Sequence, residues 1–558
     1  MSTKPLARSA AALLAAGILL SGCDDGVTAP PAIAPPAGGP RLAVIPTGDP
    51  YTYTCGRSIA PDQAAANTQI ANSYSSWKTA LVTSSGAPAG TLRVRRPSNN
   101  DDTVSEGIGY GMLLAVYLDD RATFDKLWAY ARAYHNTRGL MAWHISSTGQ
   151  VLDSGAATDA DEDMAFALIA AEKKWGGYAS AATTLINNIL THMVDASNVL
   201  KPGDVWGGSS ITNPSYFIPS FYKVFRAFTG TTRWTQVADK SYEITAAVDA
   251  RNGSGTGLQP DWTNSSGAPV SGWSYDYKYD AVRVPWRLAM DGTWYCDSRA
   301  KGHMDRIAAF FKNVGVPNIK DGYTLSGTAI GGWHNAAFVG AAGSAAMRST
   351  DAAYQRALWD ETVRLTTSDY YVSSLRLLML MFMAGRFDNP LYTLRDGFEQ
   401  GSTSRWGTFR DPASSISLSL SSPGAVGNYA MTVTYSIASW GGVNATHVSA
   451  PENWSTHKGL YFQFYGTNSG RTIRLEVLDN RAAGSTTDTA ERWEFKFADT
   501  SAGWRYVSIP WSSFTRRADW QPAGAPNDGF NRTQVWGLTL APLAGSGSFQ
   551  VDGVQTVK

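Results

Sequence analysis

Residues 157–175 read ATDADEDMAFALIAAEKKW, and this stretch decides the fold. Its apolar side chains are spaced by four, three and four residues, in the order Met164, Leu168, Ala171 and Trp175. Side chains at this spacing lie on one face of an α-helix. The stretch therefore predicts an amphipathic helix that buries one face against the rest of the protein.

The start of the same stretch is strongly acidic. Thr158 can act as the N-cap, and four of the next five residues are Asp or Glu. Acids in a first turn commonly complement the helix dipole and aid solubility, which is the ordinary interpretation. Asp159 follows the cap directly, so its carboxylate can point off the helix end. A calcium loop is excluded, because its required Gly and Glu would fall on Met164 and Ala170.

A second predicted helix start also has a capping residue followed by an acid, in the sequence SEGIGYGM at residues 105–112. Ser105 can cap this helix, and Glu106 then takes the first helical position. Each of the three glycines costs about 1 kcal/mol relative to Ala in a helix. We therefore expect a neighbouring helix or a ligand to approach this backbone closely. A dinucleotide-binding glycine motif is excluded, because its third Gly would fall on Met112 and no strand precedes the motif.

These two stretches resemble the signature segments of glycoside hydrolase family 8, the inverting endo-β-glycanases. Further matching motifs are NPSY at residues 213–216, YDAVRVPWR at residues 279–287, and Tyr370-Tyr371. The resemblance extends over residues from about 51 to 390. It implies an (α/α)6 barrel with a substrate cleft at one end of its inner helices.

The resemblance also implies the roles of three carboxylates. Inverting hydrolysis needs one acid for the leaving oxygen and one base for the attacking water. Glu106 is the expected acid and Asp280 the expected base. Asp159 is expected to position the substrate and to act electrostatically, because inversion has no covalent step. A helix start lowers the pKa of Glu106, so burial and a nearby carboxylate must raise it.

Four further residues are expected beside these carboxylates. Tyr216 and Tyr370 resemble the tyrosines that hold the base and its water, and the choice between Tyr370 and Tyr371 is open. Asp280 can instead form a structural ion pair with Arg283, three residues on, or with Lys278, and an adjacent Arg would also keep the base ionised.

Two tryptophans are candidate platforms for sugar rings. Trp143 lies in LMAWHI and Trp206 in DVWGGS. Sugar rings have apolar faces that stack on aromatic side chains, but each Trp can equally belong to the protein core.

The chain before residue 391 reads as a succession of helices joined by short loops. The predicted helices span residues 61–82, 105–118, 122–136, 160–175, 178–194, 214–229, 231–249, 285–297, 300–314, 334–346, 351–367 and 370–385. Paired in order, they form six hairpins that can close into a ring with alternate helices inside. The marked residues lie at or just before the N-terminal ends of even-numbered helices, which would meet on one face of such a ring: Glu106, Asp159, Tyr216, Asp280 and Tyr370.

Residues 391–558 alternate apolar and polar side chains in short segments, which predicts an all-β sandwich of the jelly-roll type. Asp396-Gly397-Phe398-Glu399 and Phe549-Gln550-Val551-Asp552 resemble motifs of a family 11 carbohydrate-binding module. A structural β-domain without a ligand is the alternative.

The first residues predict export. Residues 1–22 read as a signal peptide that ends in Leu20-Ser21-Gly22-Cys23, which resembles a bacterial lipobox with Cys23 as the lipidated residue. A plain signal peptide cut slightly later is the alternative. Residues 23–50 form a Pro-rich linker. We therefore expect an exported protein, held on a bacterial membrane by lipid or released. Cys55 and Cys296 are left as an even pair, and spacing leaves open whether they form a disulfide.

The composition and the absence of certain motifs argue against several other functions. The 558 residues carry a net charge of +1 with 17% charged residues, which argues against a nucleic-acid partner. No HExxH motif occurs among the seven His, and no GxSxG motif occurs, so neither a metallohydrolase nor a serine hydrolase is expected. We expect a monomer without cofactor or metal that hydrolyses cellulose or mixed-linkage β-glucan. The alternatives are a xylanase of the same family and a non-catalytic polysaccharide-binding protein.

Overall fold

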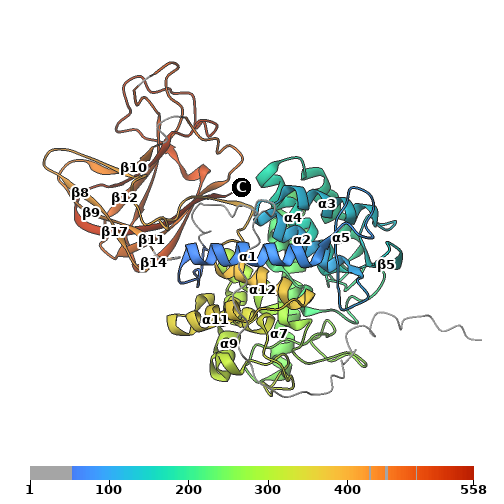
Figure 1. Ribbon diagram of the computed structural model, residues 1–558. Coiled ribbons are helices and arrows are strands. Elements are labelled where there is room, and N and C mark those ends of the chain that lie inside the picture. Colours follow the sequence, from blue (N-terminus) through green and yellow to red (C-terminus); the bar gives the residue numbers. More distant parts are fainter. Residues whose placement is uncertain (1–52, 426–428, 447–449, 486, 558) are drawn as a thin grey trace, which may run out of the picture.

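The protein consists of a helical domain and a β-domain that lie side by side in the computed structural model (Figure 1). The structure describes residues 53–425, 429–446, 450–485 and 487–557. The predicted signal peptide, Cys23 and the predicted Pro-rich linker lie outside these residues. Within the described residues, no helix is both long enough and apolar enough to cross a membrane.

The described part of the helical domain contains twelve α-helices, as predicted. Their bounds are α1 Gln63–Leu81, α2 Ser105–Tyr117, α3 Arg121–Ala133, α4 Thr158–Trp175, α5 Ala179–His192, α6 Pro219–Thr229, α7 Arg233–Asn252, α8 Val284–Trp294, α9 Ser298–Val314, α10 Ala336–Ala345, α11 Ala352–Arg364 and α12 Tyr370–Met383. Five short strands complete this domain: β1 Val82–Thr83, β2 Arg93–Val94, β3 Thr103–Val104, β4 Ala142–Ile145 and β5 Val151–Ala156.

The even-numbered helices form a closed inner ring, which confirms the predicted barrel. Each of these helices contacts the next in the order α2, α4, α6, α8, α10 and α12, and α12 in turn contacts α2. Each odd-numbered helix packs outside an even-numbered partner: α3 on α2, α5 on α4, α7 on α6, α9 on α8, α11 on α10 and α1 on α12. The inner helices α8 and α10 are buried along their whole length, whereas the outer helices bury one face. This difference follows from position, because an inner helix has protein on every side.

Three details of the predicted helix starts are wrong. Thr158 and Ser105 are the first residues of their helices rather than their caps. The Thr158 hydroxyl instead donates to the Lys201 carbonyl at 2.6 Å. Glu106 is consequently the second residue of α2. Tyr216 precedes α6, in the separate 3-10 turn Pro214–Tyr216. At the start of α4, the Asp159 carboxylate accepts the backbone N–H of Ala160, so an acid of the first turn takes part of the role expected of the cap.

The acidic start of α4 does not serve solubility. Asp159, Asp161, Glu162 and Asp163 are all buried. Asp163 forms a bidentate ion pair with Arg287 of α8, with both oxygen–nitrogen distances at 2.7 Å. Unpaired buried charge is very costly, so this pair stabilises the contact between α4 and α8 only while both partners are present.

The three glycines at the start of α2 permit close approach, as predicted. A Cβ on Gly109 would meet Ala160 and Asp163 of α4 at 3.1 and 3.0 Å, and a Cβ on Gly107 would meet the Tyr370 hydroxyl at 2.9 Å. The glycines thus bring α2 against α4 and bring Tyr370 close to Glu106.

The β-domain is a sandwich of two antiparallel sheets. One sheet has the order β15-β13-β12-β16-β10-β7, and the other has the order β14-β11-β17-β9-β8 with β6 also paired to β17. The strands are β6 Tyr392–Asp396, β7 Gly407–Arg410, β8 Ser415–Ser421, β9 Ala430–Ile437, β10 Gly441–Thr446, β11 Gly459–Thr467, β12 Thr472–Leu478, β13 Arg492–Ala498, β14 Ala502–Pro510, β15 Thr515–Arg516, β16 Gly537–Pro542 and β17 Gly545–Val557. The inward-facing side chains of both sheets form a second hydrophobic core.

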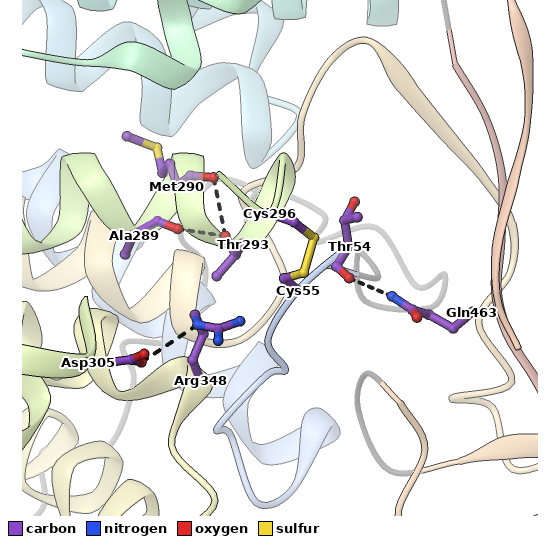
Figure 2. The surroundings of a disulfide bond; sticks show 9 residues. All are labelled: Thr54, Cys55, Ala289, Met290, Thr293, Cys296, Asp305, Arg348 and Gln463. Atoms are coloured by element: carbon purple, nitrogen blue, oxygen red, sulfur yellow. Dashed lines mark hydrogen bonds and ion pairs between the residues drawn. A yellow bond between two sulfur atoms is a disulfide. The ribbon is translucent and has the colours of Figure 1, made fainter. Parts of the chain in front are cut away.

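A disulfide links the start of the helical domain to the end of α8 (Figure 2). Cys55 and Cys296 are bonded, with their Cα atoms 5.3 Å apart. The neighbouring Thr54 carbonyl accepts a hydrogen bond from Gln463 of β11. Tyr392 of β6 packs edge-on against Tyr295, next to Cys296, and against Tyr461 of β11. The disulfide therefore anchors the segment on which the β-domain docks.

Candidate active site

Arg283 joins the three carboxylates that the sequence marks. This residue ends a 3-10 turn, Ala281–Arg283, directly before α8. Its Nη1 donates to Glu106 at 2.9 Å and to Asp159 at 2.6 Å, and its Nη2 donates to Asp280 at 2.9 Å. One buried guanidinium thus brings together carboxylates from the starts of α2, α4 and α8, because those three starts meet at one end of the inner ring.

Glu106 has the environment of a carboxylic acid that holds its proton. Burial raises the pKa of Glu106 to about 7; the Asp159 carboxylate also raises this pKa, while Arg283 lowers it. The side chain nevertheless remains 20% exposed. Desolvation of the carboxylate therefore raises the pKa of Glu106 more than the guanidinium and the helix start lower it. A general acid at this position was expected to need such a raised pKa.

Asp280 experiences a similar balance. Its pKa is raised to about 7, mainly by burial and also by the Asp261 and Asp159 carboxylates, against the lowering effect of Arg283. The predicted ion pair with Arg283 is present, but it does not keep the pKa of Asp280 low. A carboxylate with a raised pKa is a stronger base, and it is ionised only above that pKa.

The tyrosines lie around these groups in different ways. The Tyr370 hydroxyl donates to Glu106 Oε1 at 3.0 Å, so it contacts the expected acid rather than the expected base. The Tyr371 hydroxyl donates to the carbonyl of Tyr279, the residue before Asp280. The Tyr216 ring lies 5.3 Å from the Arg283 guanidinium. Tyr371 therefore contacts the segment that carries Asp280, and Tyr370 contacts Glu106.

The helical domain matches a known family. The model described as glycosyl hydrolases family 8 matches residues 49–385, which is more than half of the chain. The chain belongs to glycoside hydrolase family 8. Residues 393–558 match the model described as carbohydrate binding domain, family 11. The protein is therefore a glycoside hydrolase with an appended carbohydrate-binding module.

Relatives of this family 8 enzyme include two endoglucanases. Endoglucanase A of Acetivibrio thermocellus is 48% identical over 376 residues, 65% of this chain and 78% of that protein. Endoglucanase 2 of Ruminiclostridium josui is 47% identical over 370 residues, 64% of this chain and 79% of that protein. The solved apo structure of a β-1,3-1,4-glucanase from Paenibacillus sp. X4 has a TM-score of 0.57 and 30% identity, and the match covers 62% of this chain and 100% of that one.

The two candidate platforms differ in their surroundings in this family 8 domain. Trp143 is half-buried, stacks on His144 at 4.7 Å and packs against the main core. Trp206 is also half-buried, and it joins Trp262 and Trp273 in a cluster with ring centroids 4.4 to 5.7 Å apart. Trp206 thus belongs to an aromatic cluster, whereas Trp143 is attached to the core.

One residue near Asp280 was not predicted from the sequence. Asp261 lies in a loop, is buried, and accepts hydrogen bonds from the backbone of the segment that contains Asp280. Its surrounding sequence, QPDWTN, has no helix-start or family motif that would mark it. Among the described residues, no group of three or more His, Cys, Asp or Glu side chains could hold a metal ion.

Proposed function

We propose that this family 8 enzyme is an inverting endo-β-1,4-glucanase that acts on cellulose or mixed-linkage β-glucan, with Glu106 as general acid and Asp280 as general base. The observation that carries the assignment is the set of contacts at Arg283, which holds both carboxylates and Asp159 in one site. The endoglucanase relatives support the choice of a glucan substrate.

The proposed reaction uses the protonated and the ionised carboxyl in one step. Glu106 donates its proton to the glycosidic oxygen as the bond to the anomeric carbon breaks. Asp280 removes a proton from a water molecule that attacks the same carbon from the opposite face of the ring. The Asp159 carboxylate stabilises the positive charge that develops on the sugar ring, and its hydrogen bond from Arg283 holds that carboxylate in place.

A comparison of four polysaccharides tests this proposal. The enzyme should release reducing sugar from carboxymethylcellulose or lichenan faster than from xylan or chitosan. Faster release from xylan would favour the xylanase alternative, and no release from any of them would refute the assignment. Proton NMR of the first product from a β-linked oligosaccharide should show the α-anomer, because inversion changes the configuration in a single displacement.

We propose that the β-domain holds the enzyme on insoluble glucan through Trp520. This side chain is 50% exposed, and the guanidinium groups of Arg492 and Arg517 lie 5.8 and 5.2 Å from its ring. An aromatic face beside polar donors suits a sugar ring. The family 11 match of this domain supports a carbohydrate ligand.

Trp520→Ala should weaken retention on insoluble β-glucan about tenfold and leave hydrolysis of short soluble oligosaccharides unchanged. The expected effect is confined to the insoluble substrate, because binding to a surface raises the effective substrate concentration only where a surface exists. Retention in a pull-down assay provides the measurement. Trp440→Ala is the matched control, because Trp440 is 55% exposed in the same domain and lies between β9 and β10. Equal effects of the two variants would contradict a specific role for Trp520.

We also propose that the protein is exported, carries lipid on Cys23 and works as a monomer. The lipobox resemblance of residues 20–23 supports the lipid, and the Cys55–Cys296 disulfide suits an oxidising compartment. The full-length protein should partition into detergent, and Cys23→Ala should remain in the aqueous phase with unchanged specific activity. Recovery of the unsubstituted protein in the aqueous phase would refute the lipid anchor.

A further inference from the structure

One buried carboxylate oxygen accepts several backbone hydrogen bonds from the segment that contains Asp280. Asp261 Oδ1 accepts hydrogen bonds from three backbone N–H groups: Lys278 at 3.3 Å, Asp280 at 3.1 Å and Ala281 at 2.9 Å. An oxygen that accepts three backbone donors within four residues fixes the path of the chain between them. Here that path carries the base directly before the Ala281–Arg283 turn.

The loop that contains Asp261 also connects the base to the aromatic cluster. The backbone N–H of Asp261 donates to the Asp276 carbonyl at 2.9 Å, and that of Trp262 donates to the Ser274 carbonyl at 3.1 Å. The Trp262 ring then packs against Trp206, a candidate sugar platform. The Asp261 side chain thus contacts the segment that carries Asp280, and the side chain of the next residue, Trp262, lies beside a candidate sugar-binding surface.

We propose that Asp261 is a positioning residue that fixes the Asp280 carboxylate and, through its own negative charge, strengthens Asp280 as a base. This inference rests on the proposed function, because it assumes that Asp280 activates the water. It assigns to Asp261 no contact with the substrate.

The charges around Asp280 indicate what Asp261 contributes. Arg283 donates to Asp280 and lowers its pKa, while Asp261 and Asp159 raise it. Other titratable groups near Asp280 include the hydroxyls of Tyr216 and Tyr371, whose own pKa values burial raises well above 10.0. Neither tyrosine is therefore charged near neutral pH. Lys278, on the same segment, carries a positive charge that pairs with Asp276. Asp261 is the carboxylate with the larger effect on Asp280. Burial raises the pKa of Asp261 itself, while the hydrogen bonds from the Ala281 and Lys278 backbone lower it. The ionised form of Asp261 opposes the effect of the guanidinium on Asp280.

The test is the pH dependence of kcat in Asp261→Asn. Asparagine keeps an oxygen that accepts the backbone donors but removes the charge. The pKa of Asp280 should fall, so Asp280 should stay ionised at lower pH. The acidic limb of the profile should therefore move about one pH unit lower, with KM unchanged. The basic limb should move less, because it depends mainly on the proton of Glu106, which carries the other raised pKa of the pair. Asp261→Ala loses the acceptor as well, and its kcat should fall about a hundredfold.

Asp499→Asn is the matched control, because Asp499 accepts the backbone N–H groups of Thr467, Asn468 and Ser469 in the β-domain. It should leave both limbs unchanged. An acidic limb that stays in place in Asp261→Asn would overturn the proposal, as would a pH-independent loss accompanied by a lower unfolding temperature.

A titration of the unsubstituted enzyme keeps the proposal testable if the variants fail to fold. Side-chain carboxyl ¹³C NMR should show Asp280 and Asp261 titrating in two linked steps, and independent single steps would overturn the proposal. Absence of β-glucan hydrolysis by the unsubstituted enzyme would instead refute the proposed function, so the two failures are distinguishable.

Discussion

Glu106→Gln should reduce the hydrolysis of unmodified β-glucan oligosaccharides by about 10²- to 10⁴-fold, because glutamine has no proton to give to the leaving oxygen. The loss should be much smaller for nitrophenyl glycosides. Nitrophenolate is a good leaving group and departs without protonation. The measurement is kcat/KM for both classes of substrate, with each loss expressed relative to the unsubstituted enzyme.

Glu162→Gln is the control for this substitution. Glu162 lies on the same ring of inner helices and is fully buried, and burial raises its pKa well above its usual value. Burial thus favours the neutral form of Glu162, and a neutral carboxyl loses little when it is replaced by an amide of the same shape. Glu162→Gln should therefore retain activity on both classes of substrate. A loss in Glu106→Gln that is equal for good and poor leaving groups would contradict the role of general acid.

Asp280→Asn should cause a loss of similar size, about 10²- to 10⁴-fold, but the loss should not depend on the leaving group. The substitution removes the group that activates the water, and water is needed whichever group departs. The same pair of substrates provides the measurement. Added azide, a small anion that needs no deprotonation, should restore part of the rate and yield a glycosyl azide of inverted configuration.

Two outcomes would contradict this role for Asp280. A loss that is confined to poor leaving groups would exchange the roles of Asp280 and Glu106. A glycosyl azide of retained configuration would mean that an enzyme-bound intermediate forms, and the mechanism would then require a nucleophile in place of a base. The thermal unfolding midpoint of Asp280→Asn should be measured in parallel, because the Arg283 guanidinium loses one of its ionised partners.

The pH dependence of the unsubstituted enzyme should be bell-shaped. Glu106 must be protonated and Asp280 ionised, and burial raises the pKa of each to about 7. Activity should therefore fall at low pH as Asp280 gains a proton, and at high pH as Glu106 loses one. Because the two carboxyls share Arg283, the apparent values belong to the pair rather than to either residue alone.

Arg283 explains how two carboxyls with raised pKa values can occupy one buried site. Several carboxylates close together repel one another, and their desolvation adds to that cost. The guanidinium offers separate donors to Glu106, Asp159 and Asp280, and it lowers the pKa of both Glu106 and Asp280. Without it, burial alone would keep the base protonated. The sequence suggested a single ion pair with Asp280, but the structure places the guanidinium at the centre of the site.

Local patterns were sufficient to predict the architecture. Apolar spacing predicted the twelve helices with shifts of a few residues at their ends, except that the sixth begins at Pro219 rather than at residue 214. The period of two predicted the β-sandwich. Both periods reflect local geometry, since side chains repeat every 3.6 residues in a helix and every two in a strand. The family resemblance, and the position of the candidate residues at the starts of even-numbered helices, then predicted which carboxylates would lie together. In the structure, Arg283 joins Glu106, Asp159 and Asp280.

The interaction partners of the charged side chains became known only from the tertiary structure. The acids that follow Thr158 looked like a solvated helix start, yet they are buried because α4 lies inside a ring of other helices. Tyr370 contacts Glu106 rather than Asp280, because Gly107 lets its hydroxyl approach the start of α2. Cys55 and Cys296 are 241 residues apart in sequence, and their bond depends on where α8 ends. Asp261 carries no motif at all, since it acts through backbone donors that any sequence would present. Burial and long-range contacts, which local sequence does not encode, set the pKa values on which the proposed chemistry depends.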